Sequence, residues 1–217
     1  MSEPILTFDR VSKTYEESVF SDISFELEIG KSVCVMAPSG RGKSTLLSIA
    51  GLLLKPTSGK VFIEGVCAND LNDDEISKIR SEKIGFLFQH TQLCASLRAN
   101  ENISLPSFFN KDESKLPKQE VDASIDKFLK RFDLEKRKFY YPNQLSVGQK
   151  RRIACARALF SQPKLIIADE PTNDLDEKNK QIVVEALFEP IKKQKAGLLY
   201  ATHDEKVSSL ADKIIKL

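Results

Sequence analysis

The sequence has almost no net charge, no long apolar run and no close pair of cysteines, and each absence excludes a class of protein. Lys and Arg number 33 against 31 Asp and Glu, so charge gives no support for a nucleic-acid partner. No apolar stretch approaches the roughly 18 residues that suggest a membrane span. The opening MSEPILTFDR is too polar and acidic for a signal peptide. We therefore expect a soluble intracellular chain, for which any membrane role needs a separate partner.

The cysteines give little support for a metal or redox site. The four cysteines are widely scattered without a CxxC pair, and only two histidines accompany them. Cys34 lies in the apolar run SVCVMA, and Cys155 lies in the helical pattern RRIACARALF. We interpret both as small core residues of a protein in a reducing compartment.

Alternating strand and helix patterns predict an α/β fold with a mostly parallel sheet. Near the start, ILTF and ISFELEI alternate between apolar and polar residues, which is typical of half-exposed antiparallel strands. SVCVMA, KLIIADE and GLLYATH are continuous apolar runs, as expected of strands buried on both faces. Further strands are predicted at KVFIEG, IGFLFQ and DKIIKL, and helices at LLSIAGLLL, LSVGQKRRIACARALF and EKNKQIVVEALFEPIKKQ.

The stretch from Gln89 to Leu145 has a different pattern. EVDASIDKFLKRFDL has helical spacing of its apolar residues, and no strand is evident in this part of the sequence. We therefore expect a single domain, 1–217, in which a helical subdomain at 89–145 is inserted. The α/β core, with an antiparallel N-terminal β subdomain, then comprises 1–88 and 146–217.

Residues 37–45, APSGRGKST, have the composition of a phosphate-binding loop. They follow a predicted buried strand and precede an apolar helix, which is the order that such a loop requires. Gly40 and Gly42 allow backbone N–H groups to turn inward around a phosphate. The helix beginning near Lys43 directs its positive end at the same anion. For this segment alone, a chance match in a glycine-containing turn is the alternative.

Three side chains of this loop have predicted roles toward a nucleotide. Lys43 is expected to bridge the β- and γ-phosphates, the Ser44 hydroxyl to ligate Mg²⁺, and Thr45 to contact the α-phosphate. Ala37 stands where such loops usually carry glycine. Its position closes the strand, however, where an extended backbone accepts any small residue.

A second candidate element is KLIIADEP, an apolar strand that ends in two acids. Asp169, at the carboxyl end of the strand, is predicted to hold Mg²⁺ through its water shell. Glu170 is predicted to accept a proton from an attacking water. An ordinary strand ending in an acidic turn is the alternative, but such a strand is much less common downstream of a phosphate loop.

Together with LSVGQKRR, these segments resemble the nucleotide-binding subunit of ATP-binding-cassette (ABC) proteins over essentially the whole chain. Seven elements occur in the order and at the spacing of that family. They are Tyr15 in VSKTY (adenine stacking), residues 37–45 (Walker A), Gln89 (Q-loop), residues 145–149 (signature), residues 165–170 (Walker B), residues 173–176 (D-loop) and His203 (switch histidine).

The resemblance implies a set of site residues. Those expected to contact ATP are Tyr15, Ser39, Gly40, Arg41, Gly42, Lys43, Ser44, Thr45, Ser146, Gly148, Gln149 and Asp176. Those expected to act in hydrolysis are Glu170, His203, Gln89 and Lys43, and those expected to hold Mg²⁺ are Ser44, Gln89 and Asp169. Val147 departs from the family pattern, which has glycine there, and we expect its branched side chain to modify pairing without abolishing function.

In this family the signature completes the ATP site of the opposite subunit. The resemblance therefore implies a homodimer or heterodimer around Mg-ATP. It also implies integral membrane permease subunits, hydrolysis coupled to transport, and attachment to the cytoplasmic face of the inner membrane through that partner.

The segment from RSEKIGFLFQ through SLRANENISLP is similar to the lipoprotein-release and macrolide-export group. A cassette that signals across the membrane without transport, as in cell division, is the alternative. The DNA-repair and translation classes would need a coiled-coil insert or a second cassette, and this sequence has neither.

Overall fold

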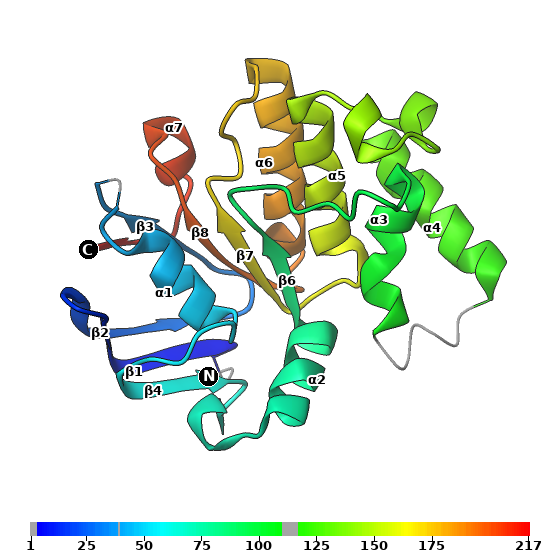
Figure 1. Ribbon diagram of the computed structural model, residues 1–217. Helices are drawn as coiled ribbons and strands as arrows, with labels where there is room; N and C mark the ends of the chain where they lie inside the picture. The colour runs from blue at the N-terminus through cyan, green and yellow to red at the C-terminus, as the bar shows by residue number, and fades with distance from the viewer. Residues whose placement is uncertain (1–3, 39, 110–116) are drawn as a thin grey trace.

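The fold is built on a five-stranded parallel sheet with helices on both faces, seen in the computed structural model that describes residues 4–38, 40–109 and 117–217 (Figure 1). The strands follow the order β6-β7-β8-β3-β9. Their bounds are Ile84–Leu87 (β6), Leu165–Asp169 (β7), Gly197–Ala201 (β8), Ser32–Met36 (β3) and Lys213–Lys216 (β9). The pairs between these neighbours are parallel, as the continuous apolar runs predicted.

A four-stranded antiparallel sheet covers one side of the molecule in the order β2-β1-β4-β5. Its strands are Leu6–Thr14 (β1), Ser18–Leu27 (β2), Ser58–Ile63 (β4) and Val66–Cys67 (β5). The two alternating N-terminal patterns are therefore confirmed as antiparallel strands. The strand predicted at KVFIEG joins this sheet rather than the parallel one.

The helices surround the parallel sheet, and a group of them extends to one side of it (Figure 1). The α-helices are Lys43–Ala50 (α1), Asp73–Lys83 (α2), Ala99–Ser104 (α3), Lys118–Arg131 (α4), Val147–Phe160 (α5), Glu177–Lys192 (α6) and Glu205–Ser208 (α7). Short 3₁₀ turns are found at Ala68–Asp70 (η1), Leu105–Phe108 (η2), Glu135–Arg137 (η4) and Pro142–Gln144 (η5). Among the described residues, no helix has the length and apolar character needed to cross a membrane.

The core consists of two apolar layers separated by the parallel sheet. Strand β3 shows the alternation: Val33 and Val35 face the antiparallel sheet and α1, whereas Cys34 faces α5 and α6. On the second side, the Phe188 ring of α6 packs edge-on against Tyr200 of β8, with ring centroids 5.8 Å apart. Because the central strands are buried on both faces, polar side chains are found mainly where these strands end.

Helix α1 ends earlier than its apolar pattern predicted. The pattern LLSIAGLLL continues to Leu54, but the helix ends at Ala50 and the chain turns at Gly51. Leu52 adopts a left-handed backbone conformation with φ of 55°, and Leu53 N–H donates to the Ser48 carbonyl at 2.8 Å. The turn lets Leu52 and Leu54 pack against the core, so tertiary packing overrides helical propensity here.

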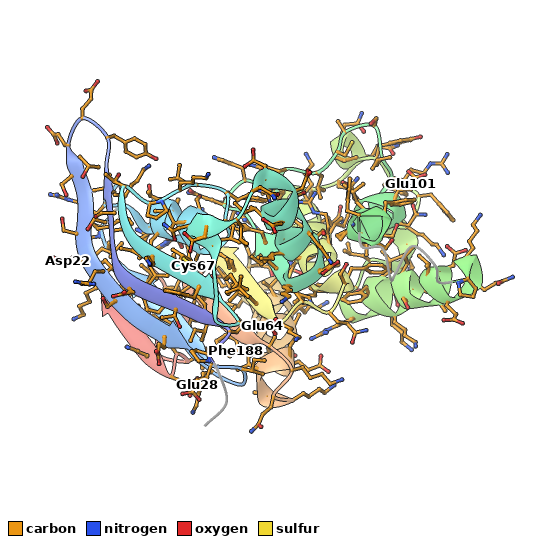
Figure 2. All side chains as sticks on the ribbon, turned by 90° about the horizontal axis from the view of Figure 1, so that it is seen from below. Asp22, Glu28, Glu64, Cys67, Glu101 and Phe188 are labelled. Atoms are coloured by element: carbon orange, nitrogen blue, oxygen red, sulfur yellow. The ribbon has the colours of Figure 1, made fainter. Side chains whose placement is uncertain are left out.

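Glu64 ties the antiparallel sheet to the rest of the fold and is labelled in Figure 2. It lies in the turn between β4 and β5 and accepts hydrogen bonds from Lys83 of α2 and, at 2.6 Å, from Lys164 just before β7. Burial alone would raise the pKa of Glu64, but the two lysines outweigh it and the pKa is lowered. One carboxylate thus connects three elements that are distant in sequence.

The cysteines are free among the described residues, and two of them lie in the core as predicted. Burial raises the pKa of the Cys34 thiol to about 11 and that of Cys155 to about 12. Both groups are therefore neutral thiols that act as small apolar residues.

The contact between β6 and α5 leaves no room for a side chain at Gly85. A Cβ placed there would lie 2.0 Å from the Ala158 carbonyl oxygen and 2.7 Å from Pro163 Cγ. We expect Gly85→Ala to lower the free energy of unfolding by about 1–3 kcal/mol through overpacking, measured by denaturant unfolding. Lys127→Ala, at an exposed position of α4, is the control. An unfolding midpoint equal to that of the control would contradict this packing.

Candidate functional site

The candidate site lies where the parallel strands end. Strands β3, β6, β7 and β8 all point the same way, so the segments that follow them emerge at one edge of the sheet. Residues 37–42 follow β3, Gln89 follows β6 after one residue, Glu170 follows β7 directly, and His203 follows β8 after one residue. The structure therefore brings four of the predicted motifs to one edge.

The glycines of the loop after β3 have the conformations that a phosphate cradle needs. Gly40 has φ of 76° and Gly42 has φ of 86°, in the region that side chains disfavour. A Cβ on Gly42 would also lie 2.5 Å from Val19 Cγ1, so close packing adds to the backbone requirement. Nζ of Lys43 donates to the carbonyls of Ala37 at 2.7 Å and Pro38 at 3.3 Å, and it therefore lies inside the loop. The predicted Ser39 is outside the described residues.

Asp169 is a buried carboxylate with an unused oxygen. It is 5% exposed, and its Oδ1 has no hydrogen-bond partner among the described residues. Burial raises its pKa, against the opposing effects of the Ser44 hydroxyl and the charges of Lys43 and Arg151. A buried, unpaired acceptor beside a serine hydroxyl fits a small divalent cation, since Mg²⁺ prefers oxygen ligands. Ser44 and Asp169 are therefore candidate ligands for such a cation.

Glu170 and His203 are in direct contact. The distance between His203 Nδ1 and Glu170 Oε2 is 2.8 Å, and the His203 backbone N–H donates to the same oxygen at 3.3 Å. Glu170 is 8% exposed and has φ of 46°, held by its N–H donating to the Ala201 carbonyl at 2.9 Å. A strained backbone conformation supported by neighbours is typical of functional sites.

The predicted signature residues lie at the start of α5, apart from α1 (Figure 1). Ser146 caps this helix, and its Oγ accepts from the Gln149 N–H at 3.3 Å while its own N–H donates to Gln149 Oε1 at 3.0 Å. Val147 is 59% exposed, and a Cβ on Gly148 would lie 3.3 Å from Leu175 Cδ2. The start of α5 is thus an ordered, exposed helix N-terminus.

Asp176 and Tyr15, two further predicted site residues, are exposed. Asp176 caps α6 by accepting from Asn179 N–H at 2.9 Å, and this bond is the main cause of its lowered pKa. Tyr15 lies in the turn between β1 and β2, is 61% exposed, and has Nζ of Lys13 4.9 Å from its ring centroid. An exposed ring is available for stacking and does not serve as core packing.

Sequence reasoning missed one residue of this region, Arg151. It is 3% exposed and lies near Asp169 and Glu170, whose charges favour its protonated form. In the sequence, the run KRR predicts only the start of a helix. The signal that could have found it is an arginine on an otherwise apolar face of that helix.

Separate from this site, a hollow of about 900 Å³ lies between α2, β6 and the helices after it. Its lining is largely apolar where η2 approaches β6, and charged along α2. The apolar lining residues include Leu53, Phe86, Phe88, Leu105, Pro106 and Phe109. Phe109 is 67% exposed. None of the candidate residues named above lines this hollow.

Comparison with known proteins assigns the family. The family described as "ABC transporter" matches residues 20–173. The uncharacterised ABC transporter ATP-binding protein MJ0796 of Methanocaldococcus jannaschii is 40% identical over 219 residues, covering 98% of this chain and 93% of that protein. The lipoprotein-releasing system ATP-binding protein LolD of Hyphomonas neptunium is 35% identical over 222 residues, covering 100% of this chain and 96% of that protein.

Solved structures agree with the sequence relatives. A dimeric, post-hydrolysis state of the MJ0796 cassette bound to ADP and Pi superposes with a TM-score of 0.92 at 38% identity, covering 98% of this chain and 94% of that one. The predicted P-loop ABC fold is therefore confirmed. With the family match and these relatives, the chain belongs to the ABC transporter family and is an ATPase of that family.

Proposed function

We propose that the chain is the ATP-hydrolysing subunit of an ABC transporter, which pairs with a second cassette around two Mg-ATP and acts on separately encoded membrane subunits. The observation that carries the proposal is the position of the signature. Ser146, Val147 and Gly148 lie at an exposed helix start apart from the phosphate loop of the same chain. A second cassette would bring its own signature to this loop. The dimeric state of the MJ0796 cassette supports the same arrangement.

The proposed binding roles follow from the geometry of the loop. Backbone N–H groups at Gly40 and Gly42, with the N-terminus of α1, would surround the β- and γ-phosphates. Lys43 would exchange its two carbonyl acceptors for phosphate oxygens, which are stronger partners for an ammonium group. Ser44, Asp169 and Gln89 would hold Mg²⁺, which supplies positive charge to the phosphate oxygens when bound.

Glu170 is proposed as the general base for hydrolysis. The Glu170 side chain is buried, and its Oε2 lies 2.8 Å from Nδ1 of His203, which orients it. The Glu170 backbone is held in a strained conformation with φ of 46°. A carboxylate fixed in this way would orient a water and accept its proton. His203, 71% exposed at its side chain, would be free to turn toward the γ-phosphate when the second cassette closes.

The hollow beside α2 is the proposed contact with the membrane subunit. Its lining includes exposed apolar side chains, Phe109 above all, and also Phe88, the residue before Gln89. A partner seated there would therefore touch the segment that carries a proposed catalytic residue. We keep the division at 89–145 as part of this proposal, because Leu105 and Pro106 of η2 line the hollow. A cell-division type of signal relay would use the same contact without transport.

Glu170→Gln should separate binding from hydrolysis. The amide keeps the shape of the side chain but cannot accept the proton of water, so turnover should fall by about 10²–10⁴. ATP binding should persist, and the ATP-bound dimer should accumulate in size-exclusion chromatography. Lys43→Ala is the control, because it should lose ATP binding and dimer together. Near-normal turnover in Glu170→Gln would remove Glu170 from the catalytic role.

Val147→Gly tests whether this exposed residue acts only between chains. Val147 is 59% exposed, so its removal should change the free energy of unfolding of the monomer by less than about 1 kcal/mol, from helix propensity alone. ATP-driven pairing should become equal or tighter, measured by analytical ultracentrifugation with ATP. Weaker pairing at unchanged monomer stability would show that the valine itself contributes to the contact.

Phe109→Asp tests the membrane contact. A charge on this exposed rim should abolish co-purification of the membrane subunit from native membranes, since burying an unpaired carboxylate is costly. The ATPase rate of the isolated chain should not change. Phe139→Asp is the matched control, because Phe139 is 59% exposed but lies outside the hollow. Equal loss of the partner in both variants would argue against this surface.

A further inference from the structure

Arg151 is a buried cation whose hydrogen-bonding capacity is only partly used. It is 3% exposed, and its Nη1 donates to the Phe88 carbonyl oxygen at 2.8 Å. Its Nε is buried without a hydrogen-bond partner among the described residues. Burying a charged group with an unsatisfied donor costs free energy, and an apolar residue would usually serve a core better.

The charges that favour this buried cation belong to the candidate site. Burial lowers the pKa of Arg151, whereas the negative charges of Asp174, Asp169 and Glu170 act to raise it. No carboxylate of the described residues lies within ion-pair distance of the guanidinium, so these effects act over a longer range. Arg151 therefore acts on the site acids through its charge without forming an ion pair with any one of them.

The hydrogen bond of Arg151 fixes the peptide that leads to Gln89. Strand β6 ends at Leu87, and the Phe88 ring stacks on Phe86 with centroids 4.1 Å apart. Because a peptide unit is planar, holding the Phe88 carbonyl also fixes the nitrogen and Cα of Gln89. The backbone position from which the Gln89 side chain extends therefore depends on Arg151.

A second arginine of the same helix holds the continuation of this segment. Arg157 donates from Nη1 to the Gln92 carbonyl at 2.8 Å and from Nη2 to the Thr91 carbonyl at 3.0 Å. Both arginines belong to α5, and α5 begins directly after Ser146. Helix α5 thus connects the signature residues at its start with Phe88, through Arg151, and with Thr91 and Gln92, through Arg157.

We propose that Arg151 is a positioning residue for ATP hydrolysis: through the Phe88 carbonyl it sets the place of Gln89 and transmits any displacement of α5 to it. This inference rests on the proposed function, because Gln89 has a role only in an ATP-hydrolysing site. Misplacement of a reacting group by about 1 Å can cost roughly 10²-fold in rate, so the effect should be large.

The experiment compares Arg151→Met, which lacks any donor, with Arg151→Lys, which keeps a charged donor. Arg131→Met is the control, because Arg131 also donates to a carbonyl, that of Ala186 at 3.1 Å, but away from the site. We expect Arg151→Met to lower kcat by about tenfold or more while the Kd for a fluorescent ATP analogue changes by less than about threefold. Arg151→Lys should recover more than half of the loss on a logarithmic scale, and Arg131→Met should match the wild type.

Each substitution is repeated in a Gln89→Ala background. If Arg151 acts through Gln89, the effects of the two substitutions on kcat should not add. In the Gln89→Ala background, Arg151→Met should then lower kcat almost no further. Additive effects, or an unchanged kcat in Arg151→Met, would overturn the proposal. A parallel loss of kcat and of ATP affinity, with no rescue by lysine, would indicate a structural role and would overturn it as well.

Hydrogen exchange of the peptide spanning 84–92 provides a readout that needs no activity. Exchange should be faster in Arg151→Met than in Arg131→Met, and equal rates would count against the proposal. If Gln89→Ala leaves no measurable turnover, this exchange measurement alone decides whether Arg151 holds the segment before Gln89. If Arg151→Met does not fold, Arg151→Gln replaces it in both measurements. An inactive wild type would reject the proposed function instead, so the two failures are distinguishable.

Discussion

The burial of two carboxylates at the end of β7 is the constraint on which the site depends. Asp169 and Glu170 are 5% and 8% exposed, and a buried carboxylate is costly unless donors or positive charges surround it. That compensation comes from three other elements. Ser44 and Lys43 come from the start of α1, Arg151 from α5, and His203 from the end of β8. The acids thus require these elements to meet at one edge of the sheet.

The site therefore has a closed base and an open rim. The base is buried and already hydrogen-bonded within one chain, through Glu170 with His203 and through Arg151 with Phe88. The rim is exposed at His203, whose side chain contacts Glu170 and is 71% accessible. An exposed side chain beside buried acids is what a site completed by a second surface would present, in agreement with the proposed pairing.

Much of the fold and the placement of the motifs followed from sequence pattern, and the exceptions share a cause. Continuous apolar runs predict buried parallel strands because both faces are covered, and β3, β7 and β8 confirm this. The end of α1 and the role of Arg151 could not be predicted in the same way. Leu52 leaves the helix to reach the core, and Arg151 reaches a carbonyl 63 residues earlier in the chain. Both depend on contacts distant in sequence, on which local periodicity carries no information.

Helix α5 gives a physical reason why pairing and hydrolysis would be coupled in this chain. Its exposed start, capped by Ser146, and its buried Arg151 are five residues apart, which is about 7.5 Å along a helix axis. Over that length an α-helix moves as a rigid unit, because each turn is held by backbone hydrogen bonds. A displacement of the start of α5 would therefore reach the Phe88 carbonyl almost undiminished, whereas a loop of the same length would absorb it. Burying Arg151 costs stability. Its hydrogen bond to the Phe88 carbonyl, which joins the rigid helix to the segment before Gln89, would give this burial a function.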